Sequence, residues 1–231
     1  LATGILYLAL TPADRHAAAG RKSSPAMRVS TRAMVVLFGC FIVVALAAGL
    51  TFNVISVALP KIVDERLGRD VSLIAVGGLA TAVFMCGALA QLAIGRLAEK
   101  FPPHILFAFI VVLEFAAILW AAHATGPTLM VALALAMGAI YGQVTVNDMV
   151  IARYTADAWR GRIYAVRYFL IFITSGAGVA LIAFLHGRGG FDLVLAATAA
   201  VAAILVLGVL GIVAVVNGAE GKRARLAQPA E

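Results

Sequence analysis

The sequence predicts an all-α membrane protein, built as a bundle of six transmembrane helices. Of its 231 residues, 63% are hydrophobic and only 13% are charged, and the mean hydropathy is +1.03. A soluble domain carries about 25% charged residues, so this chain could not solvate its own surface. The apolar residues also gather in runs that can cross a hydrocarbon core of about 30 Å as helices of about 20 residues. No alternation typical of strands persists long enough to argue for a barrel.

Charge and cysteine content narrow the function classes. The net charge of +7 does not point to nucleic acid, because the basic residues fall in a linker, a tail and short loops between the apolar runs. Both cysteines, Cys40 and Cys86, lie inside apolar runs, where we interpret them as packing residues. No Cys/His spacing suggests a metal site, and the sequence offers no catalytic residue. We therefore expect no nucleic acid, metal or cofactor as a partner.

Two segments precede the first long run. Residues 1–10 are apolar but about half as long as a span, and no basic residues stand before them as in a signal peptide. We interpret them as the end of a preceding transmembrane helix, and the chain as the C-terminal part of a longer protein. Residues 11–32 combine proline, glycine and serine with five basic residues. That composition cannot bury a core and predicts a cytoplasmic linker.

Six apolar runs follow, and each predicts one membrane-spanning helix. They form a transmembrane domain of residues 33–216, with runs at 33–59, 71–95, 104–122, 128–151, 163–186 and 193–216. Pro60 is expected to end the first run, since proline in a helix interior removes a hydrogen bond. A polar tail of residues 217–231 follows the sixth run.

The charged stretch of residues 95–103 separates the second and third runs, so we expect a tight turn at a membrane surface. Gly95 favours a close approach of two helix ends. Pro102 and Pro103 can open the next helix, because early helical positions need no backbone donor.

The distribution of basic residues predicts the orientation. Alternate crossings place the linker, the turn with Arg96 and Lys100, residues 153–167 and the tail on one side. These segments hold 14 of the 18 lysines and arginines. Because lysine and arginine are enriched in cytoplasmic loops, we expect the linker and the C-terminus in the cytoplasm. The expected location is the plasma (inner) membrane of a bacterium.

The turn carries a resemblance to a known family. It resembles the signature turn of the major facilitator superfamily of transporters, roughly Gly-x-Leu-Ala-Asp-Arg-x-Gly-Arg. Pro102 and Pro103 depart from this pattern. The positions that match it or replace it conservatively are Gly95, Leu97, Ala98, Glu99 and Lys100. The resemblance extends to Asn53 ahead of Pro60, and to Arg160-Gly161-Arg162, which is similar to the loop before the family's eleventh helix.

This resemblance implies that the six runs correspond to helices seven to twelve of the family, arranged as two inverted three-helix repeats. The first and fourth runs would line a central cavity, the second and fifth would face the other half, and the third and sixth would pack outside. The implied function is a secondary active transporter that moves a small solute by alternating access, with or without proton coupling. Its partners would be the lipid bilayer, a small-molecule substrate and the N-terminal half that completes the cavity.

Polar residues inside the apolar runs are candidate cavity residues, because polar groups at membrane depth are costly and usually face a cavity or a partner. These candidates are Asn53, Tyr141, Gln143, Asn147 and Asp148. Contact with a substrate or proton would explain them, and so would hydrogen bonding between helices. For Asp148 we favour an ion pair with Arg153 or Arg167. We also expect Arg167 to extend to the cytoplasmic surface as a snorkelling side chain.

Two further acidic residues are candidates. The resemblance places Glu99 at the cytoplasmic start of the fifth run, where pairing with Arg160 or Arg162 would act as a latch. The alternative is a solvated loop charge. The latch candidates together are Gly95, Arg96, Glu99, Lys100, Arg160 and Arg162. Glu114 lies near the centre of the third run, and this depth suggests a proton relay. The resemblance puts that helix at the periphery, which favours a neutral carboxyl group bonded to a neighbouring helix.

Two other function classes stay open. The first is the permease subunit of an ATP-driven importer, although the loop that docks the ATPase is not found in the sequence. The second is an intramembrane enzyme, suggested by Ser175 and His186. These residues are 11 positions apart on one run, hence about 16 Å apart along a helix, which is beyond hydrogen-bonding reach.

Overall fold

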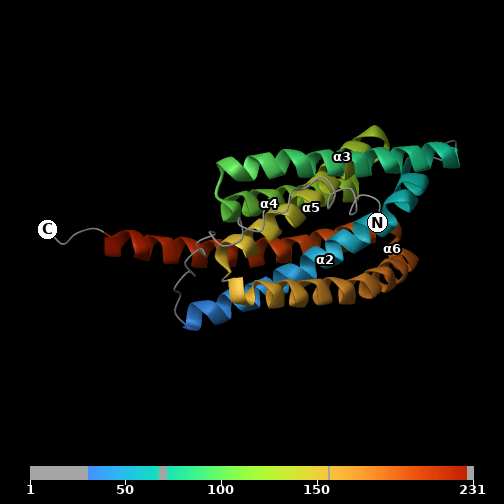
Figure 1. Cartoon of the computed structure of the whole chain (residues 1–231). Helices are drawn as coiled ribbons and strands as arrows, with labels where there is room; N and C mark the ends of the chain where they lie inside the picture. The colour runs from blue at the N-terminus through green and yellow to red at the C-terminus, as the bar shows by residue number, and fades with distance from the viewer. Residues whose placement is uncertain (1–30, 68–71, 156, 228–231) are drawn as a thin grey trace, which may run out of the picture.

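All the elements in the computed structural model are helices, and the model describes residues 31–67, 72–155 and 157–227. The helices are α2 (Thr31–Leu67), α3 (Leu73–Lys100), α4 (Pro103–His123), α5 (Gly126–Tyr154) and α6 (Asp157–Ala227) (Figure 1). The predicted helix end at residues 1–10, most of the linker and the last four residues of the tail lie outside the described part. All five helices are long and apolar enough to cross a membrane.

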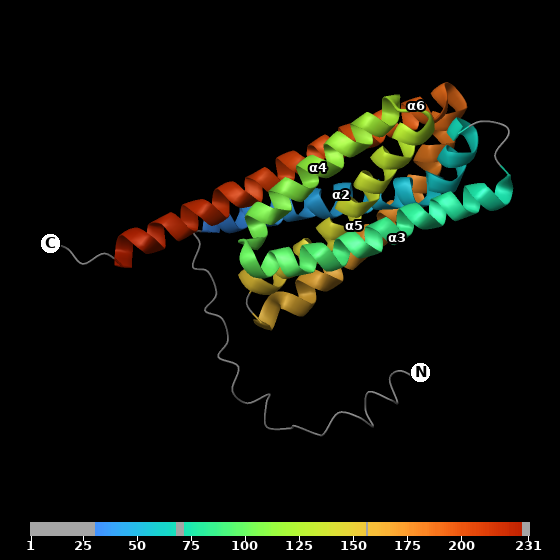
Figure 2. The ribbon, with the colours of Figure 1, turned by 90° about the horizontal axis from the view of Figure 1, so that it is seen from above.

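Helix α6 contains a break. Its backbone leaves the helical region at Gly189 and Gly190, and Gly190 has a φ of 61°, a conformation that glycine adopts without steric cost. Figures 1 and 2 show the chain folding back at this point, so that the two stretches of α6 run alongside the bundle in opposite directions. The break falls between the predicted fifth and sixth runs. The sequence therefore predicted its position, although the structure presents five candidate spans and not six.

The ends of the helices alternate between the two ends of the bundle. The start of α2, the α3–α4 turn, the α5–α6 junction and the end of α6 all lie at one end in both views (Figures 1 and 2). We call this the basic end, after its exposed or half-buried cations Arg32, Arg96, Lys100, Arg153, Arg160 and Arg162. Segments that the charge count placed on one side are thus at one end of the molecule.

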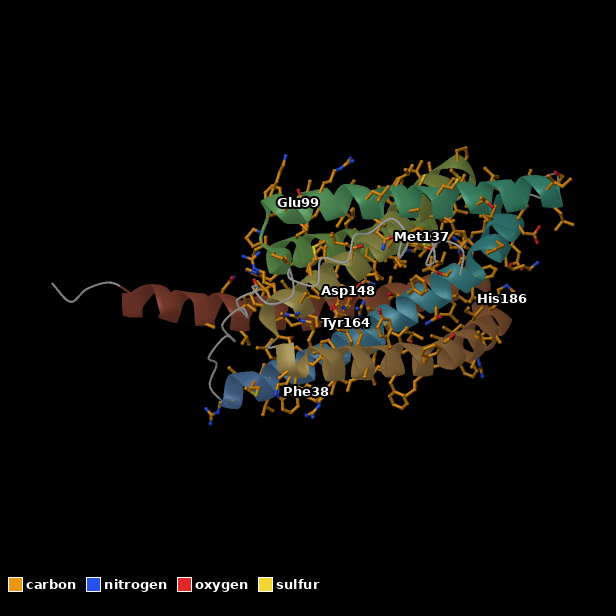
Figure 3. The ribbon with its side chains drawn as sticks, viewed as in Figure 1. Phe38, Glu99, Met137, Asp148, Tyr164 and His186 are labelled. Carbon is orange, nitrogen blue, oxygen red and sulfur yellow. The ribbon has the colours of Figure 1, made fainter. Side chains whose placement is uncertain are left out.

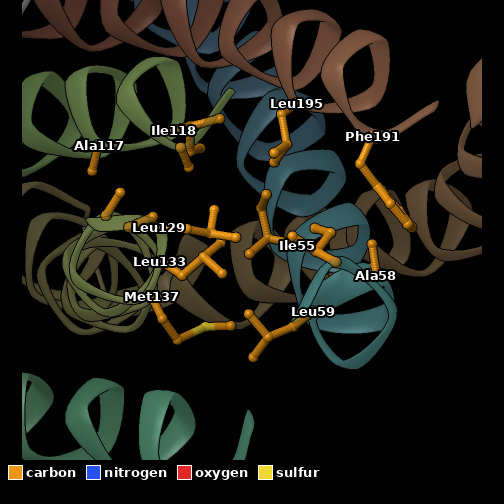
Figure 4. Close-up of a cluster of buried hydrophobic side chains, with 14 of the residues drawn as sticks. Ile55, Ala58, Leu59, Ala117, Ile118, Leu129, Leu133, Met137, Phe191 and Leu195 are labelled. Carbon is orange, nitrogen blue, oxygen red and sulfur yellow. The ribbon is translucent and has the colours of Figure 1, made fainter. Parts of the chain in front are cut away.

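The core is built from aliphatic side chains of four helices. Ile55 and Leu59 from α2 meet Ile118 from α4, Leu133 from α5 and Leu195 from α6, and all five are fully buried (Figure 4). A second buried cluster lies between α2, α4, α5 and the last stretch of α6. Because α5 packs against both α3 and α4, it is the most enclosed of the five helices, and its polar residues are held inside the protein.

Glycines set the close contact between α3 and α5. The Gly138-x-x-x-Gly142 spacing faces α3, where a Cβ at Gly138 would lie 3.3 Å from the Cβ of Ala90 and one at Gly142 would overlap Ile94. Such spacing lets two helix backbones approach closely. Gly95 has no such role, since a Cβ there would meet no neighbour within 4 Å. The close approach predicted at Gly95 is therefore wrong.

Two predicted boundaries also differ from the structure. Pro60 does not end the first span, because α2 continues through it to Leu67. A proline costs a helix one backbone hydrogen bond, but contacts of Arg66 with α4 hold the segment beyond it. The signature turn is shorter than predicted, since α3 remains helical to Lys100 and only residues 101–102 link it to α4. Pro103 opens α4 as expected.

Candidate functional site

A cavity of about 300 Å³ lies between α2, α3, α5 and α6. Small residues of α2, such as Ala48 and Gly49, leave the space open. The larger or polar side chains around it are Phe52, Gln91, Tyr141, Gln143, Asn147, Arg167 and Tyr168. The cavity is therefore mostly apolar with a few polar groups, the usual character of a small-molecule site.

Three of the five predicted cavity residues line this space, namely Tyr141, Gln143 and Asn147. They lie within two turns of α5, so the helix delivers them together. Asn53 does not line the cavity. Its Nδ2 donates to the carbonyl of Gly49 at 2.7 Å and to Oγ1 of Thr174 at 3.5 Å, which links α2 to α6. For Asn53 the contacts match the alternative of bonding between helices.

Asp148 forms an ion pair with Arg167, one of its two predicted partners. The expected snorkelling of Arg167 is wrong, because its side chain is only 3% exposed and faces the cavity. The nearby Tyr164 donates from its hydroxyl to the backbone carbonyl of Asp148 at 3.1 Å (Figure 3). Arg167 was predicted as a partner of Asp148 but not as a cavity residue, and Phe52, Gln91 and Tyr168 were not predicted at the site. The position of Arg167 one turn from the predicted start of a span fits either an inward or an outward side chain.

Several buried polar atoms of the cavity wall have no hydrogen-bond partner within the described ranges. They are Nε2 and Oε1 of Gln143 and Nε of Arg167. Gln143 is 1% exposed, and an unpartnered buried amide or guanidinium nitrogen is energetically costly. Buried groups in this state are expected where a ligand or water completes the bonding.

Three of the described lining residues are aromatic, namely Phe52, Tyr141 and Tyr168. Phe52 and Tyr141 lie with their ring centroids 6.0 Å apart, and Tyr164 and Tyr168 stack at 6.4 Å. Such rings give a ligand apolar contact area with defined orientation. The site therefore offers one cation and three amides on an aromatic and aliphatic background.

Glu114 is fully buried on α4 and does not line the cavity. Thr51 of α2 is the polar side chain that lies beside it, but the Thr51 hydroxyl donates to the carbonyl of Ala48 at 3.1 Å. Neither carboxyl oxygen has a hydrogen-bond partner among the residues that the structure describes. The proton-relay role of Glu114 stays a prediction.

The latch residues lie at the basic end. Glu99 is exposed, well away from Asp148 and Tyr164 (Figure 3). Across the described ranges no ion pair joins Glu99 to Arg160 or Arg162. Instead, Nη2 of Arg160 donates to the carbonyl of Ala152 at 2.8 Å, and Arg162 lies over the ring of Trp159. The latch role of Glu99 therefore stays a prediction.

The two residues that suggested an enzyme are not together. Ser175 is exposed on α6, whereas His186 contacts Glu65 of α2 through Nε2 at 3.0 Å. In the described part of the chain, no group of three or more His, Cys, Asp or Glu side chains could hold a metal ion.

Comparison with known proteins identifies the family. The sequence profile of the Major Facilitator Superfamily matches residues 4–230, nearly the whole chain. The chain belongs to the major facilitator superfamily. It is accordingly an integral, multi-pass membrane protein of a transporter family, with several helices long enough to span the bilayer. No curated protein matches the sequence.

Two solved structures have a similar fold. One is the E. coli fucose:proton symporter FucP, and the other is FucP in the outward conformation. Each superposes with a TM-score of 0.65 at 14% sequence identity over 75% of this chain. The chain spans 42% and 41% of the length of these two structures. At this identity the similarity concerns the fold alone.

Proposed function

We propose that this chain is one half of a secondary active transporter that moves a small solute by alternating access. The observation that carries the proposal is the cavity between α2, α3, α5 and α6, in which the buried Gln143 amide and the Nε of Arg167 have no partner among the described residues. The chain belongs to a family of transporters, and its cavity holds polar groups without partners among the described residues. A solute that binds in the cavity explains both observations best.

The proposed architecture is a six-crossing half made of two inverted three-helix repeats. In this scheme α6 crosses the membrane twice and turns back at Gly189 and Gly190. Helices α2, α3 and α4 form one repeat, while α5 and the two stretches of α6 form the other. The alternation of helix ends and the non-helical backbone at the break support this count.

A second half of the transporter completes the cavity in this proposal. The chain covers only about two-fifths of FucP, which supports a larger functional unit. The surfaces available for the second half are apolar faces of α3 and of the first stretch of α6. Their exposed side chains include Met85, Leu89, Leu92, Phe169 and Phe172. Lipid covers whatever part of these faces the second half leaves free.

The basic end faces the cytoplasm of a bacterial cell in this proposal, and the membrane is the inner membrane. Six cations at one end of the bundle support the orientation. A proton or substrate gradient supplies the energy. Neither an ATP-driven importer nor an intramembrane enzyme is favoured by any contact in the structure.

The test compares this chain alone with the protein that includes its N-terminal half, both in proteoliposomes with a panel of radiolabelled solutes. The expected result is membrane insertion of both proteins and uptake by the longer one only. Gln143→Leu should abolish uptake without affecting insertion, because it removes a buried amide from the cavity. The control Thr128→Ala, at an exposed position of α5 away from the cavity and from the faces proposed for the second half, should leave uptake unchanged. Uptake by the chain alone, or full activity of Gln143→Leu, would contradict the proposal.

A further inference from the structure

The two members of the Asp148–Arg167 ion pair are buried to very different extents. The side chain of Arg167 is 3% exposed, whereas that of Asp148 is 39% exposed. A guanidinium group inside a membrane protein is strongly destabilised unless an anion faces it. A partly exposed carboxylate can instead be hydrated on its own. The pair therefore depends on an anion at Arg167 much more than on a cation at Asp148.

Arg167 is the one charged residue among the described side chains that line the cavity. The anion that it now binds, Asp148, is outside the set of lining residues. A negatively charged group entering the cavity therefore meets a single cation in the described wall, and its one competitor there is the Asp148 carboxylate already paired with that cation. An anion is favoured over a neutral or cationic solute there when it takes the place of Asp148 on Arg167.

Unused donors surround this cation. The Nε atom of Arg167 and the Nε2 atom of Gln143 are buried and have no partner within the described residues. Both side chains line the same cavity, together with the amide of Asn147. A guanidinium group presents its N–H donors as a planar fork that matches the two oxygens of a carboxylate. The free donors are therefore suited to an oxyanion.

The remaining wall defines the rest of the ligand. Phe52, Tyr141 and Ile171 contribute aromatic and aliphatic surface to the same cavity. A space of about 300 Å³ is at the lower limit of typical ligand pockets, which range from about 300 to 1,000 Å³. The ligand that fits has a small apolar body and one charged head.

We propose, building on the transporter function above, that the cavity binds a small monocarboxylate and that its carboxylate replaces Asp148 on Arg167. The Asp148 carboxylate already shows that Arg167 accepts this group. When the substrate binds, Asp148 is released to its partly exposed surroundings, and Arg167 gains the substrate carboxylate without passing through an unpaired state. Gln143 and Asn147 bond the head group, while Phe52 and Tyr141 contact the apolar body.

The test measures binding of benzoate and of its uncharged analogue benzamide to the purified protein in lipid nanodiscs at neutral pH, by titration calorimetry. We expect benzoate to bind at least tenfold more tightly than benzamide. Arg167→Gln should remove this preference. Asp148→Asn should increase the affinity for benzoate, because it removes the competing carboxylate. Arg153→Gln removes an exposed arginine at the basic end of the bundle. It is the matched control and should leave binding of benzoate unchanged.

A folding defect in Arg167→Gln would not prevent the test. The double variant Arg167→Gln/Asp148→Asn removes both charges together, so no buried charge is left unpaired, and it should bind benzoate no better than benzamide. Thermal unfolding adds a second readout, since benzoate should stabilise Asp148→Asn more than it stabilises the wild type. The proposal is overturned if the wild type binds neither probe, if it binds both equally, or if Asp148→Asn weakens the binding of benzoate.

The outcome separates this inference from the transporter function. Uptake of neutral solutes that is insensitive to Arg167→Gln would leave a transporter and remove the carboxylate site. Conversely, the protein could bind benzoate through Arg167 and transport no member of the solute panel. That result would support the carboxylate site and contradict the transport function.

Discussion

Arg66 of α2 donates from Nη1 to the backbone carbonyl of Ala121, 2.8 Å away in the last turn of α4. The same nitrogen also lies 3.3 Å from the carbonyl of Ala122 and 3.4 Å from that of Ala124, and Nη2 pairs with Asp192 of α6. The last carbonyls of a helix have no partner within the helix. One side chain of α2 thus completes the bonding of α4 and ties it to the second stretch of α6.

Substitution of Arg66 should therefore destabilise the bundle. Arg66→Gln removes charge-assisted hydrogen bonds from a side chain that is only 11% exposed. The expected loss is about 1.5–3 kcal/mol of the free energy of unfolding, measured by denaturant titration in detergent. Lys61→Gln is the control, since Lys61 pairs with Asp64 on the exposed surface and should contribute little. Equal free energies of unfolding for the two variants would show that the Arg66 contacts with α4 and α6 do not stabilise the bundle.

The contact between α3 and α5 gives a second prediction. Gly142→Ala places a methyl group against Cδ1, the end of the Ile94 side chain, which must rotate away. We therefore expect a loss at the lower end of the about 1–3 kcal/mol that overpacking typically costs. Adding Ile94→Ala should recover part of the loss, because it empties the space that the methyl group needs. Gly95→Ala, where nothing lies within 4 Å, should be neutral or slightly stabilising, since alanine is the better helix former. Thermal unfolding of the wild type and the three variants measures these differences. A double variant that recovers none of the loss of Gly142→Ala would contradict the contact between Gly142 and Ile94.

The predicted latch role of Glu99 at the basic end gives a third prediction. If Glu99 pairs with Arg160 or Arg162 in one state of the transport cycle, Glu99→Gln should slow transport, on the order of tenfold, without impairing insertion. Labelling of a cysteine introduced by Ala152→Cys, at an exposed position of the same end, should change in rate. Exposed ion pairs contribute at most about 1 kcal/mol, so a purely solvated Glu99 predicts no measurable change. If Glu99→Gln transports at the wild-type rate and the labelling rate is unchanged, Glu99 is a solvated surface charge and not a latch.

The orientation gives a fourth prediction. A reporter that fluoresces only in the cytoplasm, fused after Glu231, should give a signal, because the end of α6 lies at the basic end. A reporter that is active only outside the cytoplasm, fused at the same site, should be silent. A silent cytoplasmic reporter on an inserted and stable protein would reverse the topology.

The positions of most helices could be predicted because they depend on local sequence. Long apolar runs must form helices in a membrane, and prolines or charged turns limit them. The run 104–122 agrees with α4 to within one residue at each end, since Pro103 opens that helix. The end of α2 was not predictable in this way. Continuation beyond Pro60 depends on Arg66 contacts with α4, more than 50 residues away in the sequence.

The cavity was predictable in part for the same reason. Tyr141, Gln143 and Asn147 are polar residues in an apolar helix. Because polar side chains are energetically costly at membrane depth unless they face a cavity or a partner, their presence indicates a cavity. Arg167 could not be placed from sequence, since near the end of a span an arginine reaches either water or the interior. The choice depends on the position of Asp148 and on the tilt of α6 against α2, neither of which is encoded locally. The contact between Gly142 and Ile94 could not be predicted either, because it depends on how α3 and α5 are aligned along each other.

Pro60 has a mechanical consequence. Proline has no N–H, so the carbonyl of Ser56 loses its helical partner and α2 is easier to bend at this level. The segment before the bend carries Gly49 and Phe52 of the cavity wall, and the segment after it is clamped to α4 and α6 by Arg66. Bending of α2 at Pro60 would therefore tilt the segment that carries Gly49 and Phe52, while the segment that carries Arg66 stays bound to α4 and α6.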